Sequence, residues 1–406
     1  MGSELYPKKL LQNVATLIMG QSPPGSTYNE SGEGIPFYQG VRDFGERYPT
    51  RRVYCTAPTR FAETGDILFS VRAPIGEVNR ATEYCAIGRG LAAMRANSGF
   101  DTTYLEYVLR HIRSEWDILE GQGAVFGNAK KSDLENLLIP WPRDIEQRAI
   151  AHILGSLDDK IELNRQMNRT LEKMAQAIFK SWFIDFDPVR AKAEGRDPGL
   201  PKEIASLFPD SFEDSELGPI PKGWKIGTIS DLAKVTSGKR PHKRSKEKTG
   251  EFTIPLYGGG GIMAYVPVPM ISTPFLLTGR VGTLGKVFRI TEECWPSDNT
   301  LLLFPNNKSC LEFLYFTLQR IDFDSLNRGS TQPLVTQTDL KNQRIVIPKE
   351  NILIFYWQNA HPMFEKIDKN IAESRALASL RDTLLPKLIS GELRVPDTEQ
   401  LVEGMV

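Results

Sequence analysis

Asp133-Leu134-Glu135-Asn136 returns in the second half of the chain as Asp339-Leu340-Lys341-Asn342. Other segments match in the same order along the two halves: 35–40 with 254–259, 75–78 with 284–287, 139–140 with 347–348, and 160–161 with 366–367. Because the order is preserved, we interpret the chain as a tandem duplication. A repeat of roughly 200 residues is domain-sized and far longer than the repeats of solenoids and propellers. Two similar domains in one chain usually address a target that itself has two similar faces.

The composition is that of a globular protein with no overall charge. The 406 residues include 50 basic and 50 acidic side chains and are 40% apolar. No apolar run approaches the ~18 residues of a membrane span, and we find no secretory leader, so we expect a cytoplasmic protein. The four cysteines form no C-x-x-C pair, which argues against a zinc site or a disulfide framework. Zero net charge argues against general coating of nucleic acid but permits a local basic patch.

The first part of each half, residues 1–141 and 226–348, is predicted to be a mixed domain of the α/β (α+β) class. Its strands are expected where short apolar runs are broken by Gly and Pro, as at 66–71, 301–304 and 344–347. Short amphipathic helices are predicted at 104–112 and 313–321.

Residues 142–183 predict one long helix. Its seam residues follow alternating steps of four and three, as in a coiled coil: Ile150, Leu154, Leu157, Ile161, Asn164, Asn168, Leu171, Ala175, Ile178 and Trp182. Asp144 is the expected N-cap, with Gln147 three residues on. At ~1.5 Å per residue, some 40 residues form a rod of about 60 Å.

The same seam recurs over residues 349–391, at Tyr356, Ala360, Met363, Ile367, Asn370, Ser374, Leu377, Arg381, Leu384 and Leu388. Pro362 is expected to bend or restart this helix, and Pro386 to end or kink it. Gly391 is the expected stop. Residues 184–225, rich in Pro and Gly, predict a partly docked connector, and 392–406 form a tail.

Each seam is an apolar stripe that needs a cover. We expect the two helices to pair as an antiparallel coiled coil, and the alternative is that each packs on its own domain. The predicted pairing residues are Leu157, Ile161, Asn164, Leu171 and Ile178 on the first helix and Met363, Ile367, Asn370, Leu377 and Leu384 on the second. A buried Asn in such a seam fixes register at some cost in stability.

No motif for catalysis is present in the sequence. There is no phosphate-binding glycine loop, nucleophile elbow or H-E-x-x-H pattern. The glycine run 258–261 lacks a following Lys-Ser or Lys-Thr and predicts a flexible turn. We therefore predict a binding protein with no catalytic residues, no metal site and no cofactor of its own.

The strongest binding signal is a basic run at 239–248, with six positive charges in ten residues, among them Lys239, Arg240, Lys243 and Arg244. Such a patch suits phosphates, although a solvated loop explains it equally well. The matching place in the first half, 21–27, is polar and uncharged and contains Gln21 and Ser22. Different side chains at one place of the fold are expected if the two copies read different bases.

Further candidates are residue types that pair with base edges, although each one alone is also explained as an ordinary surface residue. Arg favours guanine, and Asn or Gln favours adenine. The candidates are Gln39, Arg42, Arg72, Gln122, Asn128, Lys130 and Lys131 in the first half, and Tyr257, Arg280, Asn299, Arg328 and Gln332 in the second.

Several short motifs occur in a fixed order: GDILFS at 65–70, IPWP at 139–142, EQRAI at 146–150, LDDKI at 157–161, SWFIDF at 181–186, GPIPKGW at 218–224 and LLPKLISGEL at 384–393. Together with the duplication, they resemble the DNA-specificity subunit of Type I restriction–modification enzymes over nearly the whole chain. The second copy departs from the pattern at Ile352-Leu353, where the first has Glu146-Gln147.

The resemblance implies two target-recognition domains held apart by two antiparallel helices. Each domain would enter the major groove at one half of a bipartite, asymmetric DNA target, and the helices would act as a ruler for the spacer. The implied partners are double-stranded DNA, two modification subunits that bind S-adenosylmethionine and methylate adenine, and restriction subunits that use ATP and Mg. The modification and restriction subunits would dock on the exposed sides of the two helices and on the connector.

Two other functions stay open at the level of sequence. An enzyme that fuses recognition with methylation would need a cofactor-binding domain and an N/D-P-P-Y/F motif, which the sequence lacks. A scaffold that never contacts DNA is favoured by the zero net charge, and it predicts no salt-dependent affinity for DNA.

Overall fold

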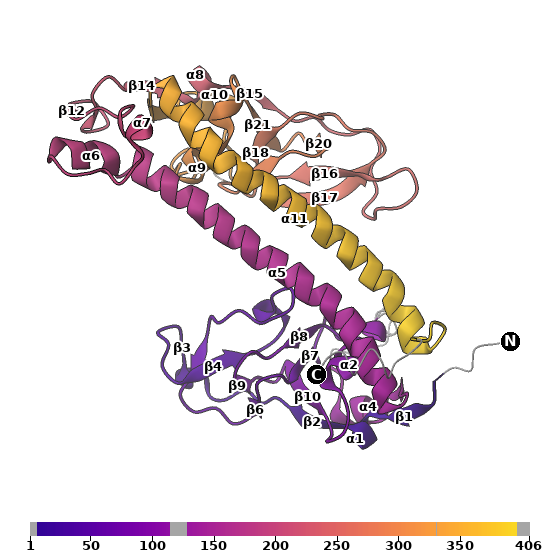
Figure 1. Ribbon diagram of the computed structural model, residues 1–406. Helices are drawn as coiled ribbons and strands as arrows, with labels where there is room; N and C mark the ends of the chain where they lie inside the picture. The colour runs from indigo at the N-terminus through magenta and orange to yellow at the C-terminus, as the bar shows by residue number, and fades with distance from the viewer. Residues whose placement is uncertain (1–5, 114–127, 330, 396–406) are drawn as a thin grey trace. The chain divides into compact units, whose positions relative to one another are not determined.

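The computed structural model describes residues 6–113, 128–329 and 331–395, which fall into two compact units (Figure 1). Unit 1 comprises Met1–Leu163 and Glu373–Val406, and unit 2 comprises Asn164–Ala372. Both divisions fall inside a long helix, α5 (Asp144–Phe183) or α11 (Glu350–Ser390). Each unit therefore contains one segment of each long helix.

Unit 1 is built on two sheets. An antiparallel sheet has the order β2 (Ala15–Met19), β10 (Leu91–Ala96), β7 (Ile67–Ser70), β8 (Val78–Arg80). A mixed sheet has the order β3 (Tyr28–Asn29), β5 (Tyr54–Cys55), β4 (Ile35–Tyr38), β9 (Cys85–Ile87), β6 (Phe61–Ala62), with β4 and β9 parallel. A separate pair joins β1 (Lys8–Leu10) to β11 (Leu138–Pro140).

Unit 2 repeats this plan. Its antiparallel sheet has the order β15 (Ala233–Ser237), β21 (Thr300–Pro305), β18 (Phe275–Gly279), β19 (Val287–Ile290). The second sheet has the order β17 (Gly261–Val266), β16 (Ile254–Gly258), β20 (Trp295–Pro296), with β16 and β20 parallel, and β14 (Lys225–Thr228) pairs with β22 (Arg344–Ile347). The duplication and the α/β class are thereby confirmed, as are strands at 66–71, 301–304 and 344–347.

Short helices complete both units. In unit 1 they are α1 (Leu11–Val14), η1 (Gly25–Thr27), η2 (Val41–Asp43), α2 (Thr102–His111) and α4 (Lys131–Glu135). In unit 2 they are α6 (Asp187–Ala193), α7 (Lys202–Ala205), α8 (Ile229–Leu232), η3 (Lys308–Cys310), α9 (Leu311–Gln319) and α10 (Gln337–Lys341). Helices α2 and α9 confirm the two short helices predicted at 104–112 and 313–321.

The repeated Asp-Leu-x-Asn motif builds the same helical turn in both units. Asp133 begins α4 by accepting from the backbone N–H of Lys130 at 2.9 Å, and Asp339 does the same for Thr336 at 3.0 Å in α10. The next residue in each copy, a leucine, is completely buried. The motif therefore recurs because it caps a helix and anchors it in the core.

Helix α5 begins at a capping arrangement that differs from the predicted one. Asp144 is the first helical residue, and the carboxylate of Glu146 accepts from the backbone N–H of Arg143 at 3.3 Å. Gln147 is completely buried and its amide donates to the Pro142 carbonyl at 2.9 Å. The prediction of Asp144 as N-cap, completed by Gln147, is wrong by one residue, because Gln147 turns back to satisfy the preceding proline.

The helix segments pair antiparallel within each unit, as predicted. In unit 1, Arg381 bonds to Asp158 at 2.5 Å, and Lys160 lies 3.7 Å from Glu373. In unit 2, Asn370 donates to Asn168 at 2.8 Å and the Tyr356 hydroxyl donates to the Ala175 carbonyl at 3.2 Å. All twenty predicted seam residues are buried or half-buried.

The pairing does not exclude packing on the domains, because the helices do both. In unit 1, Ile150 and Leu154 of α5 share a core with Leu388 of α11 and with α2. In unit 2, Phe179 and Phe183 of α5 lie in one core with α9 and α11. Each domain core thus includes segments of both long helices.

Helix α11 runs without a break past both of its prolines. The alternatives in which Pro362 restarts the helix and Pro386 ends it are therefore wrong, because the helix continues through both residues. Each proline removes one backbone hydrogen bond, but the buried neighbours Ala360, Phe364 and Leu388 hold the flanking turns in their cores. Gly391 follows the last helical residue with φ of 82°, in the left-handed region that a helix-ending glycine adopts.

The connector packs against unit 2. Phe186, Val189, Phe208 and Trp224 are all buried in the core that contains α9 and the second segment of α5. These contacts fix the route of residues 184–225 despite their Pro and Gly content.

Asp158 is the centre of a buried ionic cluster in unit 1. Its carboxylate accepts from Tyr107 at 2.8 Å, from Arg110 at 3.1 Å and from Arg381 at 2.5 Å, so one side chain joins α2, α5 and α11.

Removing one member of a buried pair leaves its partner's charge uncompensated. We expect Asp158→Asn to lower the free energy of unfolding of unit 1 by about 3 kcal/mol, measured by urea denaturation. Asp144→Asn is the matched control, since Asp144 and its partner Arg148 are both about half exposed and such a pair contributes less than about 1 kcal/mol; equal losses would contradict the assignment.

The same carboxylate predicts a pH dependence. Burial alone would raise the pKa of Asp158, but Arg110 and Arg381 more than offset burial and hold the pKa below its usual value. Such a group stabilises the fold above its unfolded-state pKa of about 3.9 and loses this contribution as the pH falls through the folded-state pKa. The difference in free energy of unfolding between wild type and Asp158→Asn should therefore shrink as the pH falls below about 4. A difference that stays constant under acid would rule out this source of stability.

Candidate nucleic-acid interface

In unit 1 the ends of strands from both sheets meet at one set of loops. The backbone N–H of Gln21 donates to the Ile87 carbonyl at 3.1 Å, and that of Gly88 to the Tyr38 carbonyl at 2.8 Å. These bonds join the segment after β2 to the turn between β9 and β10, and that turn to the end of β4. We call this set, residues 21–22, 39–43, 71–74, 88–90 and 128–131, the loop edge of unit 1.

The segment after β7 is fixed into the loop edge from two sides. The Val71 N–H donates to the Gly90 carbonyl at 2.9 Å, and the Ala129 N–H donates to the Val71 carbonyl at 2.8 Å. Arg72 and Asn128 form a β-bridge beside these bonds. The structure therefore brings Gln21, Ser22, Gln39, Arg42, Arg72, Asn128, Lys130 and Lys131 to one set of loops.

Unit 2 makes the same bonds with different residues. The Lys239 N–H donates to the Pro296 carbonyl at 3.0 Å, and the Ser297 N–H to the Tyr257 carbonyl at 2.8 Å. The Arg280 N–H donates to the Asn299 carbonyl at 2.8 Å. The loop edge of unit 2 comprises residues 239–248, 258–261, 280–284, 297–299, 327–329 and 331–335, so the two edges have one backbone and two sets of side chains.

Glycines allow the loops of each edge to pack closely. A Cβ at Gly90 would lie 2.3 Å from the Gln39 carbonyl oxygen, and one at Gly279 would lie 1.7 Å from the Thr283 oxygen. Contacts this short exclude any side chain, so these loops are held together backbone against backbone. The positions of the neighbouring polar side chains are fixed as a consequence.

The loop edge of unit 1 encloses a cavity of about 380 Å³ lined by Gln39, Arg42, Arg52 and Arg72, among others. Asp43 organises one wall: it is buried, accepts from the Gln39 N–H at 2.7 Å and forms an ion pair with Arg52 at 2.5 Å. Arg42 is exposed on η2, and Arg72 is half-buried. The lining therefore combines three arginines with two carboxylates, Asp43 and Glu30, and the Gln39 amide.

The basic loop of unit 2 is attached at two points. The Trp295 indole donates to the Lys239 carbonyl at 2.7 Å, and Ser245 forms a β-bridge with Tyr265 of β17. Lys239, Arg240, Lys243 and Arg244 are all exposed. The loop therefore presents its charges from a fixed position, and the glycine run beside it forms the turn of the β16–β17 hairpin, as predicted.

Several predicted residues have other roles in the structure. Tyr257 is only 7% exposed and its hydroxyl donates to Glu292 at 2.8 Å, so it belongs to the core and offers no surface to DNA. Arg328 forms an ion pair with Asp339, and Lys131 pairs with Glu135 at 3.3 Å. Asn299 and Gln332 are exposed at the loop edge of unit 2. Gln122 lies outside the described residues.

Sequence reasoning missed Asp43 and Arg52. Neither belongs to a recognisable motif, and the pair forms only when the segment before β5 returns beside β4, where the Phe37 N–H donates to the Val53 carbonyl at 2.9 Å. The one available signal was the adjacent pair Arg51-Arg52 in an otherwise polar loop, which is too weak to single out one residue.

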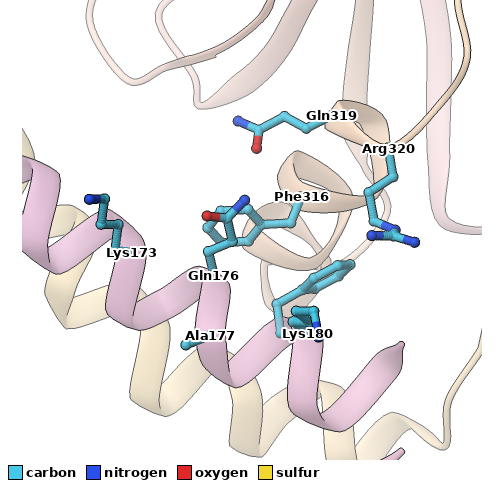
Figure 2. A pocket seen from close by; sticks show the side chains of 8 residues that line it. Lys173, Gln176, Ala177, Lys180, Phe316, Gln319 and Arg320 are labelled. Atoms are coloured by element: carbon cyan, nitrogen blue, oxygen red, sulfur yellow. The ribbon is translucent and has the colours of Figure 1, made fainter. Parts of the chain in front are cut away.

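A separate groove of about 560 Å³ lies in unit 2 between α5 and α9 (Figure 2). Its floor includes the buried rings of Phe179 and Phe316, and Lys173, Lys180 and Arg320 stand around it. Lys180 pairs with Asp185. A second hollow of about 380 Å³ shares Phe179 and Arg320 with the groove and is also lined by Leu217, Ile321 and Asp322. Exposed apolar surface is therefore supplied by the second hollow, whereas the groove itself presents mainly polar and basic side chains.

The described part of the chain contains no group of three or more His, Cys, Asp or Glu residues arranged to hold a metal ion. None of the helices in the described ranges combines the length and apolarity that crossing a bilayer requires.

Comparisons with known proteins agree with this geometry. The family model for the Type I restriction modification DNA specificity domain matches residues 6–173 and 221–372, one match for each half of the duplication. The Type I restriction enzyme MjaIX specificity subunit of Methanocaldococcus jannaschii is 30% identical over 387 residues, covering 87% of this chain and 83% of that protein. The HindI specificity subunit of Haemophilus influenzae is 28% identical, covering 68% and 73%.

Two further matches concern part of the chain and the fold. The putative MjaX specificity subunit of M. jannaschii is 43% identical over 179 residues, which are 44% of this chain and 40% of that protein. The crystal structure of a Type I restriction–modification S subunit from M. genitalium superposes with a TM-score of 0.60 at 18% identity, covering 95% and 96% of the two chains, and shows the shared fold. The chain belongs to the family of DNA-specificity subunits of Type I restriction–modification enzymes.

Proposed function

We propose that this chain binds a bipartite, asymmetric DNA sequence, with one loop edge for each half-site. It thereby directs the partner subunits, which perform the chemistry, to that sequence. The observation that carries the proposal is the repetition of one loop-edge backbone with two different sets of side chains. A shared backbone supports a shared way of docking on DNA, and different side chains support different base preferences.

The charges at the two edges fit double-stranded DNA in different ways. Arg42, Arg52 and Arg72 line a cavity in unit 1, whereas the exposed lysines and arginines of 239–248 form a patch in unit 2. Exposed cations suit phosphates, and arginines held in a cavity suit base edges. A chain with no net charge can therefore still bind DNA locally.

Specificity subunits of this family act in complexes with DNA and with other subunits. Two modification subunits and the restriction subunits are the proposed partners, and they would carry S-adenosylmethionine, ATP and Mg, because this chain is proposed to have no catalytic role. The groove between α5 and α9 supports a docking role, since the exposed Lys173, Lys180 and Arg320 at its rim suit an acidic segment of a partner. Work on genomic DNA also implies a cytoplasmic location.

If each unit recognises one half-site, a domain exchange should change only one half of the DNA target. Replacing residues 226–348 with the equivalent segment of another family member should change one half of the methylated motif and leave the other half and the spacer intact. The readout is sequencing of N6-methyladenine in a methylation-free host that expresses the chain with its modification subunit. Exchange of residues 8–140 is the reciprocal control, and a change of both halves in either hybrid would refute one address per unit.

The docking role predicts a defect in assembly. The double change Lys173→Glu, Arg320→Glu reverses the charge on the groove rim and should weaken binding of the modification subunit by about tenfold or more, measured by titration and native mass spectrometry. Lys234→Glu, an exposed charge on β15 outside the groove, should leave assembly unchanged. If the double variant assembles as tightly as wild type, the partner docks elsewhere.

A further inference from the structure

Each loop edge contains one arginine with an unusual environment. The Nε atoms of Arg72 and Arg280 are buried and have no hydrogen-bond partner among the described residues. Arg280 directly follows β18, whereas Val71 separates Arg72 from β7, so the two arginines are displaced by one residue between the copies. A buried donor without an acceptor costs about 1–3 kcal/mol, so such a donor at each loop edge indicates a side chain that gains an acceptor from a ligand.

Both arginines stand on backbone that is fixed before any ligand binds. In unit 1 the preceding residue, Val71, is bonded on both sides, to Gly90 at 2.9 Å and to Ala129 at 2.8 Å. In unit 2 the arginine itself is bonded on both sides: its N–H donates to Asn299 at 2.8 Å, and its carbonyl accepts from Val335 at 2.9 Å. A group that distinguishes bases must be held in place, whereas a phosphate contact tolerates a flexible side chain.

The other arginines of the two edges are less suited to this role. Arg52 is committed to Asp43, and Arg328 to Asp339. Arg42 and Arg89 are exposed at the edge of unit 1, and Arg240 and Arg244 are exposed on the basic loop, so contact with phosphate is the ordinary expectation for all four. Arg72 lines a cavity beside Gln39, whose side chain is exposed.

We infer that Arg72 and Arg280 each read one guanine, Arg72 in the half-site of unit 1 and Arg280 in that of unit 2. The inference rests on the proposed function and names part of its target. A guanidinium group donates two parallel hydrogen bonds to O6 and N7 of guanine in the major groove, and no other base presents that pair of acceptors. Each half-site should therefore contain a G·C pair that tolerates no substitution.

Conservative variants separate base reading from phosphate contact. The full chain is expressed with its modification subunit, and N6-methyladenine is mapped for wild type, Arg72→Lys and Arg280→Lys. Lysine keeps the positive charge but cannot donate the two parallel hydrogen bonds of a guanidinium group. Each variant should relax one guanine in its own half-site by roughly 5- to 150-fold, while the other half-site and the spacer stay as in wild type. The intact half-site also shows that the variant has folded, so each variant controls the other.

Binding to synthetic duplexes gives a second, direct readout. Once the wild-type motif is known, 7-deazaguanine replaces each guanine of the half-sites in turn, which removes N7 and leaves Watson–Crick pairing intact. The modified base should weaken binding of the wild-type complex at one guanine per half-site. In the Arg72→Lys complex, 7-deazaguanine should cause no further loss of binding at the guanine that Arg72 reads. In the Arg280→Lys complex, it should cause no further loss at the guanine that Arg280 reads.

The outcomes distinguish failure of the proposed function from failure of the assignment of Arg72 and Arg280. A wild-type complex that yields no bipartite motif would overturn the proposed function and the inference with it. A bipartite motif that both lysine variants leave unchanged, that they weaken evenly at all positions, or that lacks a G·C pair in a half-site would overturn the inference alone.

Discussion

The apolar seam shared by α5 and α11 is the constraint on which the rest of the structure depends. A long helix with one apolar stripe is not stable alone in water, because most helix stability in proteins comes from packing of that stripe. Here each helix gives one segment to each unit, and both segments are covered by the other helix and by a domain core. A domain of this kind is therefore incomplete without helical residues that lie far away in the sequence.

The two units reach this arrangement with different chemistry. Unit 1 ties α2 to the helix pair through the Asp158 cluster. Unit 2 ties α9 to α5 through the Tyr315 hydroxyl, which donates to Glu172 at 2.7 Å. It adds aromatic rings, with Phe183 packed edge-on against both Phe313 and Tyr356 at ring distances of 5.0 and 5.2 Å. Aromatic pairs of this geometry add about 0.5–1.5 kcal/mol each beyond the area they bury. Both units therefore hold the helix pair by polar contacts, and unit 2 adds aromatic packing.

One buried ion pair is nevertheless kept in both units. Arg80 bonds to Glu106 at 2.7 Å, and Arg289 lies 3.3 Å from Glu312 at the matching place between sheet and helix. Such pairs add little net stability compared with apolar replacements, but they penalise any other packing of the helix on the sheet. The divergence between the copies is concentrated instead at the loop edges, where a frame of glycines and backbone hydrogen bonds leaves the side chains free to differ.

The sequence by itself determined the duplication, the α/β class, the two long helices and their seam, since each depends on local periodicity or on a repeated capping motif such as that of Asp133 and Asp339. It also named several polar side chains of the two loop edges by residue type. It did not give the uninterrupted course of α11 past Pro362 and Pro386, the buried position of Tyr257, or the role of Asp43 in holding Arg52. These features were decided by tertiary structure alone, because each is the outcome of packing between segments that are distant in the chain, where buried contacts outweigh the local preferences that a sequence displays.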